Sequence, residues 1–237
     1  MMRVAMGHLL RDLRWPDVRP ILDAGATAIL PIGAEAKEHG PHLPFSTDHR
    51  TASSLGARLA ETENVLVWPT VGYGHYPAFR HYPGSTSVPE GAFESTIQAL
   101  LEDLARHEAK RILVLNTGIS TIRGVDAACG YVERAGAIHV YRGERYLAVV
   151  GEVCEQERGG HADEAETSVM LHLHPELVDM DRAPTWTAEV KPGPWSATDK
   201  SSPSYSPHGI FGDATLATAE KGTRLVAAML EDLRAAL

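Results

Sequence analysis

The sequence is poor in cysteine, in long apolar runs and in clustered basic residues, and each shortage argues against a class of protein. Only two cysteines are present, Cys129 and Cys154, and neither belongs to a Cys-x-x-Cys pair. They cannot build a disulfide framework, so we expect two buried thiols in a reducing compartment. No apolar run approaches the length of a membrane span, so no association with a membrane is expected.

The net charge and the N-terminal residues argue against further classes of protein. The formal net charge is -9, and the sequence has no stripe of Lys and Arg, which argues against a surface for nucleic acid. Residues 1–15 carry several charges and contain no apolar core of signal-peptide length. These features predict a cytoplasmic protein with no nucleic-acid partner and no association with a membrane.

What is present is a regular alternation of strand-like and helix-like segments along 237 residues. Short apolar runs predict strands at residues 26–32, 65–68, 111–115 and 137–141, with 146–150 as a possible fifth. Helices are expected at residues 47–60, 89–109, 125–135 and 162–173, in a segment 9–22 broken at Pro16 and Pro20, and from Asp213 or Thr215 onward. The alternation predicts one α/β domain over residues 1–237, with three α/β/α layers and a mostly parallel central sheet.

The most informative stretch is the loop of residues 33–48, which follows the apolar run 26–32. It carries Glu38, His39 and Asp48 and is stiffened by two prolines. Because ligands of open α/β sheets bind beyond the carboxyl ends of the strands, these side chains are candidates for a metal site. Imidazole and carboxylate groups at short spacing are donors that zinc or manganese takes. A polar loop that simply faces water is the alternative.

A second polar segment starts at His161, directly after two glycines. Acidic side chains near a helix start are favoured by the helix dipole, which accounts for Asp163 and Glu164 without any ligand. That explanation does not extend to His161, because a charged imidazole gains nothing at a helix N-terminus. The glycines would also let the backbone approach a ligand closely, so His161 is a candidate for the site.

The loop of residues 116–121, after the third predicted strand, has two interpretations. Its hydroxyls and amides could donate hydrogen bonds to a substrate oxygen, which makes Ser120 a candidate. Alternatively, Thr117, Ser120 or Thr121 caps the next helix, and this is the safer interpretation.

Two long loops, residues 71–88 and 185–207, are rich in Gly, Pro and aromatic residues, and loops of this length are usually functional. Candidates there for shaping a substrate pocket are His75, His81, Trp186 and Trp195. No serine lies in a nucleophile elbow and no phosphate-binding glycine loop is present, so metal-assisted chemistry is preferred over a covalent route.

Several of these segments resemble the creatininase (creatinine amidohydrolase) family. The strongest matches are His-Gly-Pro-His-Leu-Pro at residues 39–44, followed by Asp48, and the segment 161–168 with its Glu-Thr-Ser ending. Weaker or C-terminal matches lie at residues 82–86 and 212–222. Because these blocks occur in family order, the resemblance covers nearly the whole chain.

The resemblance implies a two-metal amidohydrolase site. One metal would be held by His39, Asp48 and Glu166, all of which are present. His161 matches a histidine that binds substrate or handles a proton in that family. Because the family tends to form ring-like hexamers, the resemblance also implies a homo-oligomer.

The second metal site of the family is incomplete in this sequence. Lys37 stands at the position of a glutamate ligand, Gly118 at that of a histidine ligand and Ser120 at that of the catalytic acid. Glu38, displaced by one position, is expected to replace the missing glutamate, with Glu35 as the fallback. The number of divalent ions, one or two per chain, therefore stays open, and creatinine itself is a poor guess for the substrate.

Two functions follow from these observations. In the first, the protein hydrolyses a cyclic amide, lactone or related ring through a metal-activated water, and His161 moves the proton. In the second, the departures from the family pattern indicate a metal-dependent isomerase or lyase on a sugar-like substrate, or a catalytically silent binding protein. A purely structural module would explain neither the pair His39 and Asp48 nor the pair His161 and Glu166.

Overall fold

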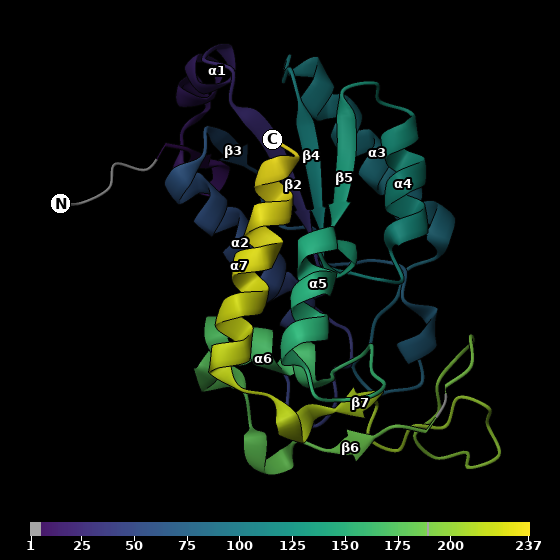
Figure 1. The fold of residues 1–237 in the computed structure, drawn as a ribbon. Coiled ribbons are helices and arrows are strands. Elements are labelled where there is room, and N and C mark those ends of the chain that lie inside the picture. Colours follow the sequence, from purple (N-terminus) through teal and green to yellow (C-terminus); the bar gives the residue numbers. More distant parts are fainter. Residues whose placement is uncertain (1–5, 189) are drawn as a thin grey trace.

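The computed structural model describes residues 6–188 and 190–237, and its centre is a five-stranded parallel sheet (Figure 1). The strand order is β1-β3-β2-β4-β5. The bounds are β1 His8–Leu9, β2 Thr27–Ile32, β3 Val65–Val67, β4 Ile112–Asn116 and β5 Ala135–His139. In the central pair, Ile32 of β2 lies opposite Asn116 of β4, so both strands end at the same level. Four of these strands were predicted from their apolar runs, and β1 was not.

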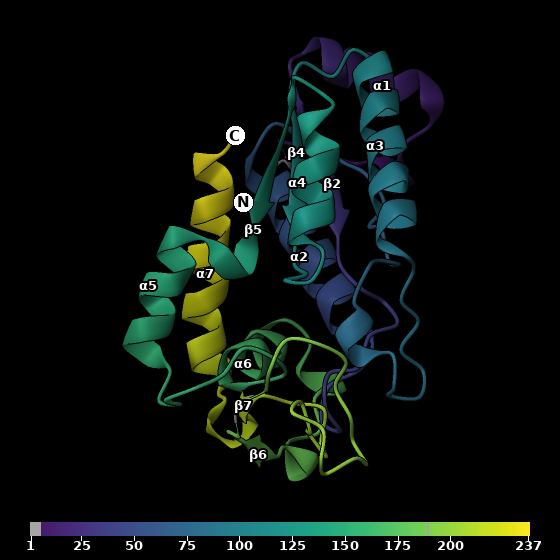
Figure 2. The same cartoon turned by 90° about the vertical axis from the view of Figure 1, so that its right-hand side faces the viewer.

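Helices cover both faces of the sheet, which confirms the predicted three-layer α/β architecture. One face packs against α2 (Thr47–Thr62), α5 (Glu144–Val153), α6 (Glu164–Leu173) and α7 (Ala219–Ala235). The other face packs against α1 (Trp15–Asp23), α3 (Glu90–Arg106) and α4 (Ile122–Gly130). Figure 2 shows α5 and α7 on one side of the sheet and α3 on the other.

The apolar runs are continuous because every strand residue of β2 and β4 is buried on one face or the other. Ile29 and Leu113 belong to the core beneath α2 and α7. Their neighbours Leu30 and Val114 belong to the core beneath α3 and α4. Successive side chains of a strand point to opposite faces, so a strand covered on both sides is mostly apolar. The exceptions are Thr27 and Asn116, at the ends of β2 and β4.

Several segments differ from the sequence-based expectations. The helix expected at residues 125–135 is shorter at its end, since α4 ends at Gly130 and Ala135 already belongs to β5. Residues 146–150, a possible fifth strand, form the middle of α5, whose Tyr146 is buried in the core shared with α7. The last helix begins at Ala219, where the Thr218 hydroxyl accepts a hydrogen bond from the Lys221 amide. The expected break before Pro20 does not occur, since α1 continues through this residue to Asp23. Among the described helices, none has the length and apolar composition needed to cross a membrane.

The carboxyl ends of the central strands face the lower end of the molecule in Figure 1, where α6 and a small antiparallel pair lie. That pair is β6 (Thr185–Trp186) with β7 (Gly212–Asp213). The loop after β2, the start of α2 and the start of α6 therefore meet beyond the sheet edge. His161 joins this region through backbone hydrogen bonds with Phe211 in both directions.

Candidate metal centre

The loop after β2 brings His39 and Asp48 together in the interior. Asp48 lies in the first turn of α2, and the structure fully buries its side chain and that of His39. The loop is held tightly, because Thr117 donates one hydroxyl to the carbonyl oxygens of both Ile32 and Asp48. A Cβ atom at Gly33 would overlap the Asp48 carbonyl, so only glycine allows this close approach.

The ring of His39 is oriented by the backbone of its own loop. Its Nδ1 lies 2.9 Å from the carbonyl oxygen of Lys37, so Nδ1 carries the hydrogen and donates it. Burial and the nearby Lys37 charge lower the pKa of His39, so the neutral ring leaves a lone pair on Nε2. This atom lies 3.3 Å from Asp48 Oδ1, and neither atom makes a hydrogen bond with any described residue. Backbone-oriented imidazoles with a free second nitrogen are typical of metal ligands.

The second oxygen of Asp48 faces a lysine. Lys37 Nζ lies 2.6 Å from Asp48 Oδ2, and both side chains are almost completely buried. Burial opposes ionisation of Asp48, but the adjacent Lys37 charge outweighs it and lowers the pKa of this carboxyl to about 2. Burial likewise opposes the charge on Lys37, and Asp48 with the neighbouring acids outweighs it, so the pKa of Lys37 is raised.

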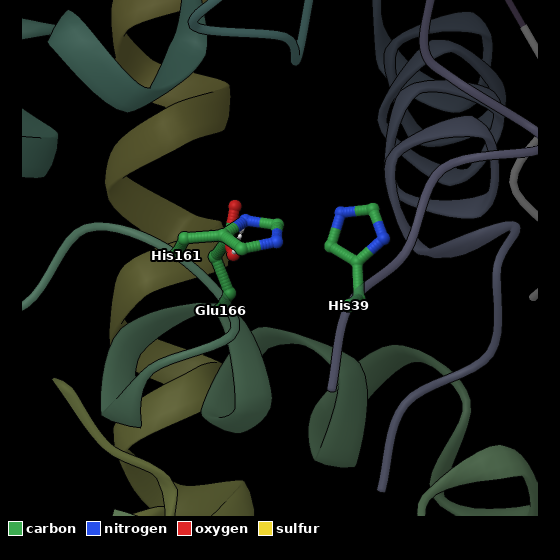
Figure 3. A group of neighbouring side chains, drawn as sticks. All are labelled: His39, His161 and Glu166. Atoms are coloured by element: carbon green, nitrogen blue, oxygen red, sulfur yellow. Dashed lines mark ion pairs between the residues drawn. The ribbon is translucent and has the colours of Figure 1, made fainter. Parts of the chain in front are cut away.

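His161 and Glu166 come from the segment that begins α6. Asp163 caps this helix by accepting hydrogen bonds from the amides of Ala165 and Glu166, so its acidic side chain has the structural role that the helix dipole favours. His161 Nδ1 lies 3.6 Å from Glu166 Oε2, shown as a dashed line in Figure 3. Burial and the Lys37 charge lower the pKa of His161 well below its ordinary value, which keeps the ring neutral.

These elements place three potential ligands around one point. The ligand atoms of His39, His161 and Glu166 all lie within 4.8 Å of one another. In Figure 3 the two imidazoles face each other, with Glu166 behind His161. Burial raises the pKa of Glu166 to about 8 in the absence of a metal. The buried atoms His39 Nε2 and Asp48 Oδ1, which have no hydrogen-bond partner among the described residues, together with the carboxyl of Glu166 nearby, fit a divalent cation such as zinc or manganese.

Glu38, predicted as a ligand, lies at the edge of this group. One of its oxygens accepts a hydrogen bond from the Gly40 amide, and the other lies 3.4 Å from His161 Nε2. Burial raises the pKa of Glu38 to about 8. The fallback ligand, Glu35, is exposed on the outside of the loop.

The four residues predicted to bind substrate are spread over the surrounding loops. His75 Nδ1 lies 3.0 Å from the Val88 carbonyl oxygen and His81 is exposed. Ser120 is exposed, and Trp186 donates its indole N–H to the Tyr205 carbonyl. Their roles stay predictions.

Two aromatic residues are instead in ring contact with His161. Phe79 lies 4.2 Å from the His161 ring and Trp195 lies 5.6 Å from it, measured between centroids. Trp195 was one of the aromatic candidates in the long loops, whereas Phe79 gave no signal in the sequence beyond lying in such a loop.

The loop of residues 116–121 does not cap α4 through a side chain. Thr121 is the N-terminal boundary residue, but its hydroxyl makes no capping bond to the helix. It donates within the loop instead, to Asn116 Oδ1 and to the Gly118 carbonyl oxygen. The preferred interpretation of these hydroxyls as helix caps is therefore wrong.

A cavity of about 510 Å³ reaches Glu166 from the side of α5. Its lining includes Tyr141, whose buried hydroxyl makes no hydrogen bond within the described chain, together with Arg142 and Arg158. The sequence contains no signal that assigns these residues to a site, and its apolar pattern predicts Tyr141 as the end of a strand.

Comparisons with known proteins agree with this arrangement. The family model described as creatinine amidohydrolase matches residues 11–237. The creatinine amidohydrolase of Pseudomonas putida is 26% identical over 95% of this chain and 94% of its own length. The mycofactocin precursor peptide peptidase of Mycobacterium ulcerans is 31% identical over 86% of this chain and 81% of its own length.

Among solved structures, a mutant creatininase described as of the Zn–Zn type has the same fold. It superposes with a TM-score of 0.80 at 24% identity and covers 98% of this chain and 97% of its own. The family model spans almost the whole sequence, and each of these similar proteins covers at least 86% of this chain. The chain belongs to the creatininase family.

Proposed function

We propose that this protein is a metal-dependent hydrolase that cleaves a C–N bond, most simply a cyclic amide, in a small molecule. The observation that carries the proposal is the pair His39 Nε2 and Asp48 Oδ1. Two buried atoms with lone pairs face each other at 3.3 Å without a hydrogen bond. Burying such atoms without a partner costs free energy, and a cation between ligands removes that cost.

In this proposal His39, Asp48 and Glu166 hold one divalent ion, zinc or manganese, and Glu38 borders the site. When bound, such an ion polarises a substrate carbonyl and lowers the pKa of a bound water. The carboxylates would have to be ionised to act as ligands, so binding releases protons from groups whose pKa burial has raised.

His161 is the proposed proton carrier. Its Nε2 lies 3.0 Å from the carbonyl oxygen of Glu38 and donates to it, which leaves Nδ1 unprotonated in the neutral ring. That nitrogen faces Glu166 and can accept a proton from the attacking water. The same nitrogen can then give the proton to the leaving nitrogen of the amide. Phe79 and Trp195 hold the ring in place and exclude bulk water from it.

The cavity supports a small-molecule substrate. Its volume of about 510 Å³ lies in the range of small-molecule sites, and it ends at Glu166. Two similar proteins, an amidohydrolase and a peptide peptidase, both act on C–N bonds by their names. The homo-oligomer and the cytoplasmic location expected from the sequence stay predictions.

The experiment is a screen of cyclic amides, lactones and short peptides with zinc- or manganese-loaded protein, read by mass spectrometry. Hydrolysis adds one water to the mass of the substrate, whereas an isomerase leaves the mass unchanged and a lyase gives fragments without added water. The proposal expects water addition that stops after metal removal. Turnover that continues in the metal-free protein would contradict it.

A further inference from the structure

We propose that the Lys37 ammonium takes the place of a second cation at Asp48, so that the centre binds one divalent ion per chain. The inference rests on the proposed metal-dependent function and specifies the stoichiometry of its site. The two carboxylate oxygens of Asp48 have different neighbours: His39 lies beside Oδ1 and Lys37 lies beside Oδ2.

Lys37 is built into the site. Its Nζ lies 2.6 Å from Asp48 Oδ2, with exposed side-chain fractions of 6% for Lys37 and 0% for Asp48. Phe79 holds the ammonium from another direction, with the ring centroid 5.3 Å from Nζ. The ammonium is therefore attracted by the negative charge of the carboxylate and by the negative face of the aromatic ring.

The two sides of Asp48 differ in what they offer to a metal. On the Oδ1 side lies His39 Nε2, a buried nitrogen without a hydrogen bond. On the Lys37 side lies a cavity of only about 10 Å³, bordered by Gly118 and Thr121, which is about the space of one water. Apart from Asp48 itself, none of its lining residues is a His, Cys, Asp or Glu.

The loop of residues 116–121 restricts the space on the Oδ2 side of Asp48 further. A Cβ atom at Gly118 would overlap the Thr121 hydroxyl, so a longer side chain has no room to enter there. That hydroxyl is fixed by hydrogen bonds of 2.8 Å to Asn116 Oδ1 and 2.9 Å to the Gly118 carbonyl oxygen. On its Oδ2 side, Asp48 therefore already has a cation, the Lys37 ammonium. The small cavity there adds no His, Cys, Asp or Glu ligand and has no space for a second metal ion.

A divalent ion at Oδ2 would also have to approach a buried ammonium of the same sign. Repulsion between like charges is strong where water is excluded. The arrangement contrasts with the similar creatininase described as of the Zn–Zn type. In the present chain Asp48 would connect one metal ion with one ammonium. Chelators would remove the first and leave the second.

The test is elemental analysis of protein loaded with excess zinc, given as ions per folded chain. We compare the wild type with Lys37→Glu, which replaces the ammonium by a carboxylate beside Asp48. Lys110→Glu is the matched control, because it makes the same charge change at an exposed position. The proposal expects about one ion in the wild type and in Lys110→Glu, rising toward two in Lys37→Glu.

Two results would overturn the inference while leaving the metal-dependent function intact. These are two ions in the wild type, or one ion in a folded Lys37→Glu variant. No ion in the folded wild type would instead refute the proposed function, so the two failures are distinguishable.

If Lys37→Glu does not fold, anomalous scattering from zinc-soaked wild-type crystals shows whether one or two zinc ions bind at Asp48. One zinc peak beside Oδ1, with Lys37 still on Oδ2, supports the inference. A second peak on Oδ2 with Lys37 displaced overturns it.

Discussion

The carbonyl oxygen of Glu38 lies 3.0 Å from Nε2 of His161, a residue 123 positions later in the chain. This contact joins the loop after β2 to the segment that begins α6. It also fixes the tautomer of His161, because a carbonyl oxygen can only accept a hydrogen bond. The two motif segments are thus connected through the protein itself, and the free Nδ1 of His161 is aimed toward Glu166 by that connection.

The proposed role of His161 as proton carrier predicts that it acts on the proton, while His39, Asp48 and Glu166 retain the metal. His161→Asn should lower kcat by about 10²–10⁴-fold, the usual range for losing a general acid or base. Metal content, measured by elemental analysis, should stay at the wild-type value. His172→Asn, in the last turn of α6, is the control and should keep the wild-type kcat and the wild-type metal content. Loss of the metal from His161→Asn would show instead that His161 is a ligand.

The buried pair Lys37 and Asp48 predicts strong coupling in stability. Asp48→Asn leaves a buried ammonium without its counter-charge, and breaking such pairs typically costs about 3–5 kcal/mol. Lys37→Met should be destabilising for the corresponding reason. Urea unfolding of the metal-free proteins measures both costs. The double variant should cost clearly less than the sum of the single variants, and simple additivity would refute the coupling.

The raised pKa values of two carboxyls predict a pH dependence of the metal-free protein. Burial raises the pKa of Glu38 and of Glu166 to about 8, above the ordinary value of 4.5. Between these values the folded state binds more protons than the unfolded chain, so the free energy of unfolding falls as pH rises. The buried His39 and His161 have lowered pKa values. They therefore change the free energy of unfolding only below about pH 6.5, where histidines titrate in the unfolded chain.

The window from pH 7 to 8 therefore isolates the two glutamates, because the cysteine thiols, with an ordinary pKa of 9.0, titrate in the unfolded chain mainly above it. Urea unfolding without metal should show decreasing stability across this window. The variants Glu38→Gln and Glu166→Gln should each flatten the slope. A slope that is unchanged in both variants would show that other groups cause it.

The cysteines should be poorly reactive. Burial raises the pKa of Cys129 to about 11 and that of Cys154 to about 12. At pH 8 about one thousandth or less of either thiol is then ionised, and the thiolate is the reactive form. Alkylation by iodoacetamide, followed by mass spectrometry, should be far slower than for glutathione under native conditions. It should reach both cysteines rapidly in urea. Rapid native labelling would contradict the pKa values.

Much of the fold follows from local patterns in the sequence. Apart from Thr27 and Asn116 at their ends, the runs at β2 and β4 are apolar because helices cover both faces, and such runs can be recognised without a structure. Residues 146–150 could not be assigned in this way. A run of five apolar or aromatic residues suits a buried strand and a buried helix equally. Its helical form is stabilised by packing on α7, more than seventy residues later.

The candidate site was predictable in its parts but not in its contacts. The sequence indicated His39, Asp48, His161 and Glu166, and the structure brings all four to one region. The sequence also contains Lys37, but the contact of its side chain with Asp48 depends on how the loop folds back. The position of Trp195 beside His161 depends on the path of a long loop, which local patterns do not determine.

The most direct test of the account is the metal content of the wild type compared with His39→Ala and Glu166→Ala. His107→Ala and Glu61→Ala serve as controls, since both residues are exposed and neither is a proposed ligand. We expect about one ion per chain in the wild type and in the controls, and almost none in the two ligand variants. Full metal content in folded His39→Ala and Glu166→Ala would show that the metal centre is not where the structure indicates.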